Sequence, residues 1–353
     1  MIGSTMEGER RDAVRAVGDL AALVLCAGLG TRLRPLTDRV PKPAVPVCGI
    51  PLVRWNLALL RGAGARRAVV NVHHLPEAMA RAAQDAGAAL GLPVAVSREP
   101  VIAGTGGALR EARALLGEAR EILLVNGDVL FDVDLAEALA AHRASGALAT
   151  MVLLPMPPGA RYAAVEVDGA GAVRRIAGAF GPGGDGLTPW HFSGVHVLSA
   201  ALLDRVPAAP FECDVNRHVY PPLMAEGLVR GFVASGPWNG RAAAGGYWND
   251  LGTPARYLRA NLDVLRGRVP LARFPGIDPL AGEVPSSHAL VARSARIQGA
   301  GRLRDAVVGE RCVVPAGAIV ERAVLWDGTA LAPGEQVVDA IAAADLRVPA
   351  TGE

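Results

Sequence analysis

Lysine is nearly absent from this chain of 353 residues. Lysine and arginine together number 36, and Lys42 is the single lysine among them. A compact ammonium group on a flexible stem makes different contacts from a wide planar guanidinium group. A tight pocket around one phosphate oxygen can therefore require the first and exclude the second. Because Lys42 lies close to a glycine-rich segment, we interpret its retention as a sign of a chemical role.

Cysteine and long apolar runs are also scarce. The four cysteines, Cys26, Cys48, Cys213 and Cys312, form no CxxC pair, which argues against a disulfide framework or a zinc site. No run of 18 apolar residues is present, so we expect no membrane-spanning helix. The net charge of +2 is too balanced to indicate nucleic-acid binding. We therefore expect a cytoplasmic protein with neither a membrane nor a nucleic-acid partner.

Apolar runs alternate with helical patterns through the first half of the chain. The expected strands are 22–27, 68–72, 94–97, 122–125 and 149–154, and the expected helices are 52–62, 76–90, 107–116 and 135–143. Strict alternation predicts an α/β fold built of βαβ units, with a Rossmann-like, mixed but mostly parallel sheet and helices on both faces. In such sheets ligands bind at the carboxyl ends of the strands.

The chain is expected to divide into a polar leader (1–20), a main domain (21–266), a proline-rich linker (267–285) and a repeat domain (286–345). The main domain becomes irregular after residue 155, with short strands at 163–167 and 195–198, and ends with a helix at 254–265.

A six-residue apolar repeat distinguishes the last segment. Its members form three triplets, Val291, Ile297 and Leu303, then Val308, Val314 and Val320, then Leu325, Leu331 and Val337. One coil per triplet predicts a short left-handed parallel β-helix. A few ordinary strands with coincidental spacing would give the same pattern.

Gly28-Leu29-Gly30-Thr31-Arg32 follows the first expected strand and is typical of a backbone anion site, because glycine lets N–H groups approach phosphate oxygens. The P-loop motif is excluded because no lysine follows the glycines. The dinucleotide motif is excluded because Leu33 stands where a third glycine is needed. Arg32 and Lys42 flank the segment, and two cations favour a triphosphate over a diphosphate.

These residues resemble the signature of the sugar-1-phosphate nucleotidylyltransferases, also called nucleotide-sugar pyrophosphorylases. The first block runs from Gly28 to Thr37 and continues with Pro41-Lys42-Pro43. Later blocks follow in the family's order at Glu99, 104–107, 126–128, 192–194 and 248–254. The pattern is most similar to mannose-1-phosphate guanylyltransferase-like members. The repeat segment also resembles the β-helix that many of these enzymes carry.

The resemblance implies a reaction in which a sugar-1-phosphate oxygen attacks the α-phosphorus of a nucleoside triphosphate and pyrophosphate leaves. It also implies four catalytic residues, Arg32, Lys42, Asp128 and Asp250, and Mg²⁺ as the cofactor, held by Asp128 and Asp250. Arg32 would bind the β- and γ-phosphates. Lys42 would lie where the α-phosphate and the sugar phosphate meet.

The resemblance also implies two sets of binding residues. Those for the nucleotide are Leu25, Ala27, Gly28, Leu29, Gly30, Thr31, Glu99, Gly104, Thr105 and Gly127. Those for the sugar phosphate are Gly107, Asn126 and Gly194. A carboxylate can accept the adjacent N1–H and N2–H₂ groups of guanine, so Glu99 favours GTP.

Several alternatives stay open. A UTP- or dTTP-dependent enzyme for glucose-1-phosphate or N-acetylmuramate-1-phosphate fits the same blocks, as does a non-catalytic sugar-nucleotide-sensing subunit of the same fold. Many relatives have a mid-domain Glu-Lys-Pro motif whose lysine binds the sugar phosphate. This chain lacks it, and Arg174 or Arg175 is the candidate replacement. The repeat segment is expected to support a homo-oligomer, because an open β-helix end invites a partner.

Overall fold

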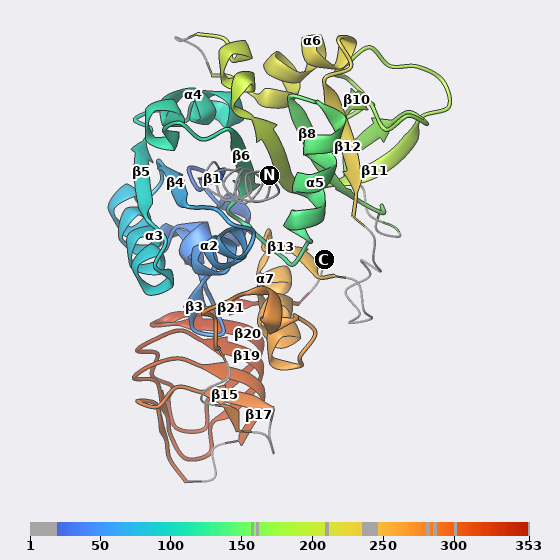
Figure 1. Cartoon of the computed structure of the whole chain (residues 1–353). Helices are drawn as coiled ribbons and strands as arrows, with labels where there is room; N and C mark the ends of the chain where they lie inside the picture. Colours follow the sequence, from blue (N-terminus) through green and yellow to red (C-terminus); the bar gives the residue numbers. More distant parts are fainter. Residues whose placement is uncertain are drawn as a thin grey trace, which may run out of the picture.

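The computed structural model describes residues 20–156, 159, 162–208, 212–234, 246–279, 283–284, 288–299 and 302–351. The expected leader lies outside the described residues except for Leu20. So do residues 280–282 and 285 of the expected linker and residues 286–287 and 300–301 of the expected repeat domain. The described chain forms an α/β body followed by a stack of short strands (Figure 1). No helix in these ranges is long and apolar enough to cross a membrane.

A nine-stranded sheet forms the centre of the α/β body. Four of its strands are parallel and lie in the order β6 (Glu121–Asn126), β1 (Leu20–Leu25), β4 (Arg67–Val72) and β5 (Val94–Arg98). Alternate side chains of β1 enter two different apolar clusters, one on each face of the sheet. Burial on both faces explains why this strand is a continuous apolar run in the sequence.

Helices cover both faces, as the sequence predicts. One apolar cluster contains side chains of α2 (Leu52–Gly62), α3 (Pro76–Leu90), α5 (Leu135–Ser145) and α7 (Pro254–Leu265). The other contains side chains of α4 (Gly104–Leu116) and α6 (Tyr220–Ala225). The helix α5 begins at Asp134, whose carboxylate accepts the N–H groups of Ala136 and Glu137 and so satisfies donors that have no partner inside the helix.

The parallel order ends at β6, which the strict alternation in the sequence does not indicate. The remaining strands of the sheet are β8 (Ala149–Leu154), β9 (Ala164–Val167), β10 (Val173–Ile176), β11 (Thr188–Ser199) and β12 (Val229–Val233). The long strand β11 lies next to β6 and runs antiparallel to β6, β8 and β9. Only its last residues are recognisable in the sequence, because its register shifts around Gly194, which has φ +90°.

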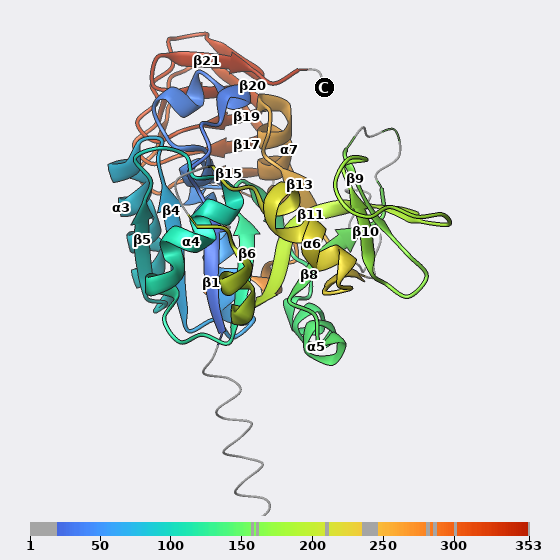
Figure 2. The same ribbon diagram turned by 90° about the horizontal axis from the view of Figure 1, so that it is seen from above.

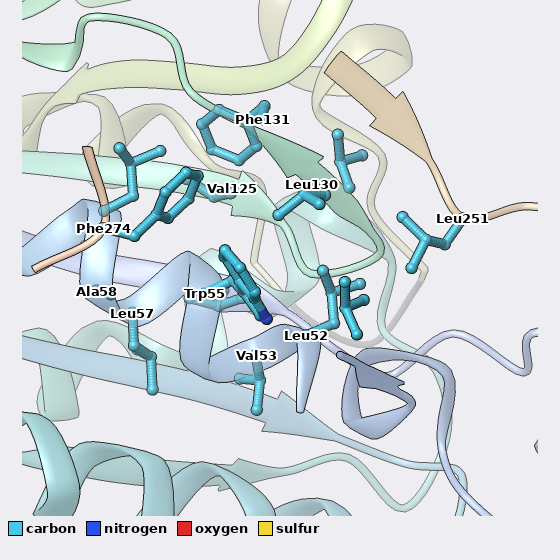
Figure 3. Close-up of a cluster of buried hydrophobic side chains, with 14 of the residues drawn as sticks. Leu52, Val53, Trp55, Leu57, Ala58, Val125, Leu130, Phe131, Leu251 and Phe274 are labelled. Atoms are coloured by element: carbon cyan, nitrogen blue, oxygen red, sulfur yellow. The ribbon is translucent and has the colours of Figure 1, made fainter. Parts of the chain in front are cut away.

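A buried aromatic cluster supports two further strands, β7 (Val129–Phe131) and β13 (Trp248–Asp250), which pair antiparallel. Figure 3 shows Phe131 of β7, Leu251 after β13 and Trp55 of α2 in this cluster. The Trp55 ring meets the edge of Phe274 at 5.1 Å between centroids. These strands carry or adjoin two aspartates of the expected site, so core packing fixes the position of their backbone.

The C-terminal stack consists of β14 (Glu283–Val284), β15 (Ala289–Val291), β16 (Arg296–Ile297), β17 (Arg302–Val308), β18 (Val313–Val314), β19 (Ile319–Leu325), β20 (Gln336–Ala343) and β21 (Leu346–Pro349). Its parallel pairs share one offset of 17 residues, as in Val291 with Val308 and Val308 with Leu325. Members of the six-residue repeat therefore stack on their equivalents, and they form the core of this region.

The helix α7 lies between the α/β body and the C-terminal stack (Figure 2). The hydroxyl of its Tyr257 donates to the carbonyl of Pro46 at 2.5 Å and accepts from Nε1 of Trp326 at 2.8 Å. Pro46 belongs to the short strand β2 (Pro46–Val47), which pairs with β3 (Ile50–Pro51). Arg39 pairs with Asp345 at 2.6 Å, which makes a second link between the two parts.

Candidate active site

The glycine-rich segment turns sharply after β1 and leads into a 3₁₀ turn at Thr31–Leu33. Gly30 adopts a left-handed conformation, with φ +61°, and its carbonyl accepts from the Thr37 hydroxyl at 2.9 Å. A Cβ atom at Gly30 would lie 3.0 Å from Cβ of Lys42. Glycine is therefore needed both for the backbone conformation and for the close approach of Lys42.

Lys42 opens a second 3₁₀ turn, Lys42–Ala44, and its side chain is only 7% exposed. Its Nζ atom lies 2.7 Å from Oδ2 of Asp128, which follows the end of β6. Burial, with a further contribution from the Asp128 carboxylate, raises the pKa of the Cys26 thiol. Cys26 therefore stays a neutral thiol and is not a candidate nucleophile.

Asp250 lies beside Asp128 because β13 pairs with β7 and the Leu251 N–H donates to the Asp128 carbonyl at 3.0 Å. The Asp250 carboxylate pairs with Arg256 and accepts from the Tyr162 hydroxyl at 3.4 Å. Within the described residues, no group of three or more His, Cys, Asp or Glu side chains could hold a metal ion. Asp128 and Asp250 are two carboxylates whose backbone segments are joined by the hydrogen bond from Leu251 to Asp128, and Mg²⁺ typically binds one or two carboxylates together with substrate phosphates.

Glu99 is buried, and both of its carboxylate oxygens are held. Oε1 accepts from Nδ2 of Asn71 at 2.8 Å, and Oε2 accepts from the Ala103 N–H at 3.0 Å. The Asn71 side chain also accepts the Cys26 N–H at 2.6 Å. Asn71 therefore connects the end of β1 to Glu99 and orients the carboxylate. An ionised carboxylate has about four acceptor sites, so Glu99 can still accept further hydrogen bonds.

The glycines at the start of α4 have a structural cause beyond the expected approach of a nucleotide. The N–H groups of Gly106 and Gly107 donate to the carbonyl of Cys213 at 2.7 and 3.0 Å. A Cβ atom at Gly104 would lie 2.6 Å from that carbonyl oxygen, and one at Gly106 would lie 2.6 Å from the Cys213 sulfur. These glycines let α4 pack against the segment around Cys213.

These elements surround a cavity of about 350 Å³ at the carboxyl ends of the parallel strands. Twelve residues expected from the sequence line it, namely Leu25, Ala27, Gly28, Gly30, Thr31, Arg32, Lys42, Glu99, Gly104, Thr105, Asn126 and Asp128. A volume of this size is within the range of small-molecule sites. The structure therefore brings most of the expected residues together around one cavity.

Five expected residues do not line this cavity, namely Leu29, Gly107, Gly127, Gly194 and Asp250. Leu29 is exposed. A Cβ atom at Gly127 would lie 2.6 Å from the Cys26 sulfur, and one at Gly194 would lie 3.2 Å from Asn126. Gly127 and Gly194 therefore allow close packing behind the cavity.

Four lining residues were missed as site residues, namely Pro43, Asn71, Ile102 and Gly252. The sequence position of Asn71 could have indicated its role, because a buried amide at the end of an apolar strand needs hydrogen-bond partners for both of its polar atoms. Gly252 accommodates Arg32, since a Cβ atom there would lie 3.1 Å from both terminal guanidinium nitrogens.

Neither arginine proposed to replace the missing mid-domain lysine lines the cavity. Arg175 pairs with Glu166, and Arg174 lies 3.9 Å from Asp168. The buried His191 packs against Tyr162 and Trp248, with ring centroids 4.3 and 4.4 Å away, and these two rings also contact each other at 5.7 Å.

Comparison with known proteins gives consistent matches. Residues 21–267 match the family model "Nucleotidyl transferase". The chain is 30% identical to a mannose-1-phosphate guanylyltransferase of Mycobacterium tuberculosis, over 87% of this chain and 84% of that protein. It is 27% identical to a UTP–glucose-1-phosphate uridylyltransferase of Synechocystis, over 94% and 89% of the two chains. It is 28% identical to a probable mannose-1-phosphate guanylyltransferase 1 of Oryza sativa subsp. japonica, over 88% and 82%.

Proposed function

The chain belongs to the nucleotidyl transferase family, and we propose from this membership and from the cavity the reaction that it performs. It transfers a nucleotidyl group from a nucleoside triphosphate to a sugar-1-phosphate, which yields a nucleotide sugar and pyrophosphate. The observation that carries this proposal is the convergence of Arg32, Lys42 and Asp128 on one glycine-lined cavity. The non-catalytic alternative is disfavoured because these groups and Asp250 are all present.

Positioning and charge neutralisation provide the catalysis, because phosphoryl-type transfer needs little covalent chemistry from the protein. Backbone N–H groups from Gly28 to Thr31 bind the triphosphate, and Arg32 holds the β- and γ-phosphates until pyrophosphate leaves. Lys42 contacts the α-phosphate, where the sugar phosphate oxygen attacks. Its ammonium group already lies 2.7 Å from Asp128, so it is oriented before the substrates bind.

We propose Mg²⁺ as the cofactor, held by Asp128 and Asp250. The two carboxylates suit this ion, because each uses only one oxygen in an ion pair. Oδ2 of Asp128 pairs with Lys42, and Oδ1 of Asp250 pairs with Arg256. The second oxygen of each is available as a hard ligand. When bound, the ion would stabilise negative charge on the phosphates.

GTP is the proposed nucleotide and mannose-1-phosphate the proposed acceptor. Glu99 lines the cavity, and its oriented carboxylate suits the two adjacent donors of guanine. Two of the relatives described above are named as mannose-1-phosphate guanylyltransferases, the rice protein as a probable one. The Synechocystis relative, a uridylyltransferase, keeps UTP with glucose-1-phosphate as the alternative.

The test is pyrophosphate release with Mg²⁺ across a grid of substrates. GTP, UTP, dTTP, ATP and CTP are each combined with mannose-, glucose-, heptose-, N-acetylglucosamine- and N-acetylmuramate-1-phosphate. We expect the highest rate with GTP and mannose-1-phosphate. Activity with none of the pairs, in a protein that still binds nucleotide, would favour the sensing subunit.

A substitution tests the base assignment separately. Glu99→Gln keeps the size of the side chain but replaces one acceptor with a donor, so we expect the GTP-to-UTP ratio of kcat/KM to fall about 10-fold or more. An unchanged ratio would mean that Glu99 does not contact the base. Glu77→Gln, at a carboxylate that pairs with Arg98 on the surface, is the control.

We further propose that the C-terminal stack is a left-handed β-helix and that it supports a homo-oligomer. The six-residue spacing within each triplet and the uniform 17-residue offset support one coil per triplet. The mass in solution, measured by light scattering, tests the oligomer. A monomer at micromolar concentration would contradict it.

A further inference from the structure

The helix α7 begins close to the second aspartate and brings a cation into contact with it. Arg256 lies in the first turn of α7, and its Nη1 atom pairs with Oδ1 of Asp250. Its guanidinium group also lies over the ring of Tyr162, 5.7 Å from the centroid. The side chain of Arg256 is 24% exposed, so it is partly buried but not sealed from solvent.

Arg256 forms an ion pair with Asp250, as Lys42 does with Asp128. Each joins one of two neighbouring carboxylates to one cation. A guanidinium group has five N–H donors in a planar fork, so Arg256 can stay on Asp250 and still donate to a phosphate. The two cations therefore each hold one of two carboxylates whose backbone segments are joined by the hydrogen bond from Leu251 to Asp128.

The proposed reaction brings together two phosphate groups, one from each substrate, and both are negatively charged. Arg32 and Lys42 line the cavity in which the nucleotide would bind. Because Lys42 is the only lysine, a second permanently charged side chain for the sugar phosphate has to be an arginine. Arg256 pairs with Asp250, a residue of the proposed reaction, whereas Arg175 pairs with Glu166 of the neighbouring strand β9, and neither arginine lines the cavity.

The groups next to Arg256 suit a sugar. Both ring nitrogens of His191 are buried and have no hydrogen-bond partner among the described residues. Burial, with a smaller contribution from the charge of Arg256, lowers the pKa of His191 to about 4, so the ring is neutral at pH 7. A neutral imidazole offers one donor and one acceptor, which matches a hydroxyl group. Tyr162 and Trp248 contact His191 and each other, so the three rings form one aromatic group next to Arg256.

We infer that Arg256 binds the phosphate of the sugar-1-phosphate, with the sugar next to His191 and Tyr162. The inference rests on the proposed function, because it assigns a residue to the second substrate of that reaction. It gives Arg256 a role that differs from that of Arg32, which serves the nucleotide.

The test compares Arg256→Gln and Arg256→Lys with Arg259→Gln as a matched control. Arg259 is on the same helix, and its exposed side chain lies 3.5 Å from Asp263, which also pairs with Arg268. For Arg256→Gln we expect the KM for the sugar-1-phosphate to rise roughly 10- to 100-fold, the effect of losing a charged hydrogen-bond partner. The KM for the nucleoside triphosphate should change less than about 3-fold. Arg256→Lys should recover part of the loss, and Arg259→Gln should behave like the wild type.

Two results would overturn the inference. One is an unchanged KM for the sugar-1-phosphate in Arg256→Gln. The other is an equal loss of affinity for the triphosphate, which would mean that Arg256 only orders Asp250.

Equilibrium titration of the wild type and Arg256→Gln with mannose-1-phosphate and glucose-1-phosphate separates this inference from the proposed function. If no substrate pair reacts, the proposed function fails. The titration still decides the inference, because weaker binding to the variant supports it and equal binding overturns it.

Discussion

Lys42 shows how one side chain can be constrained by several neighbours at once. Its ammonium group contacts Asp128, its Cβ atom lies against the space that Gly30 leaves free, and its side chain is 7% exposed. A guanidinium group is wider and cannot occupy the space of the ammonium group without moving the Asp128 carboxylate. Conservation of charge is therefore not sufficient at this position.

We expect Lys42→Arg to lower kcat about 100-fold, which is the usual effect of displacing one group that stabilises the transition state. The measurement is pyrophosphate release at saturating substrates, with the thermal unfolding midpoint as the check on folding. A loss of less than about 3-fold with an unchanged midpoint would show that the pocket tolerates the larger group.

Asp128 gives a second prediction for a single side chain. Asp128→Asn removes the charge that pairs with Lys42 and a proposed ligand of Mg²⁺, so we expect kcat to fall by about 100-fold or more. The Mg²⁺ concentration for half-maximal rate should rise in the same variant. Asp204→Asn, at an exposed carboxylate that pairs with Arg113, is the control and should leave both values unchanged. Near-normal turnover in Asp128→Asn would contradict the metal role.

Several elements could be predicted from the sequence to the residue. The helices α2, α3 and α7 and the strand β8 have the expected limits, because each has a clear apolar pattern ended by glycine, proline or a polar residue. The strand β11 could not be predicted in full, because its register shift and Gly194 interrupt the pattern. Its place between β6 and β8 depends on contacts between distant segments, which periodicity does not report.

The candidate site also has a part that the sequence predicts and a part that depends on the fold. The cavity lining that follows β1 was expected from glycine and charge. The support that Asn71 gives to Glu99 and the pairing of Arg256 with Asp250 depend on the fold. The sequence predicts ligand contact for the glycines at the start of α4, whereas their packing against Cys213 becomes visible only in three dimensions. The division of the chain into domains stays a prediction.

The helix α7 provides a prediction about elements. The hydroxyl of Tyr257 is buried and connects Pro46 to Trp326, so Tyr257→Phe leaves an acceptor and a donor without this partner. We expect the free energy of unfolding to fall by about 1–3 kcal/mol. Trp326→Phe removes one of the same hydrogen bonds, so the double variant should lose less than the sum of the two single variants. Denaturant unfolding of all four proteins measures this coupling, and strict additivity would contradict a shared hydrogen bond.

One apolar cluster extends through much of the molecule. It includes side chains of α2, α7 and the C-terminal strands, such as Leu57, Leu258 and Ile341. Because the α/β body and the last strands of the C-terminal stack share this core, we expect them to unfold together in one transition. Two separate calorimetric transitions would contradict this expectation.

Buried histidines make the stability of the whole protein sensitive to acid. Burial lowers the pKa of His196 to about 3 and is the main cause that lowers the pKa of His191 to about 4. In the unfolded chain a histidine has a pKa of about 6.5, so below that pH the unfolded state binds more protons and stability falls. Each histidine should cost about 1 kcal/mol of unfolding free energy between pH 7.5 and 5.5.

The variant His196→Gln tests this pH dependence. Glutamine can still accept from the Tyr220 hydroxyl but does not titrate, so the loss between the two pH values should shrink by about 1 kcal/mol. His288→Gln, at a side chain that is 72% exposed, is the control. An equal loss in the wild type and His196→Gln would show that other groups cause the acid sensitivity.

The uniform 17-residue offset of the C-terminal stack also constrains how this part of the protein can evolve. Insertion of one residue into a strand would turn the later inward side chains of that strand outward, because side chains alternate along each strand. Duplication of a whole 17-residue unit would preserve the pairing between neighbouring strands, since all parallel pairs of the stack share this offset. Lengths in descendants of this chain should therefore change in steps of 17 residues, and intermediate lengths should be confined to the turns.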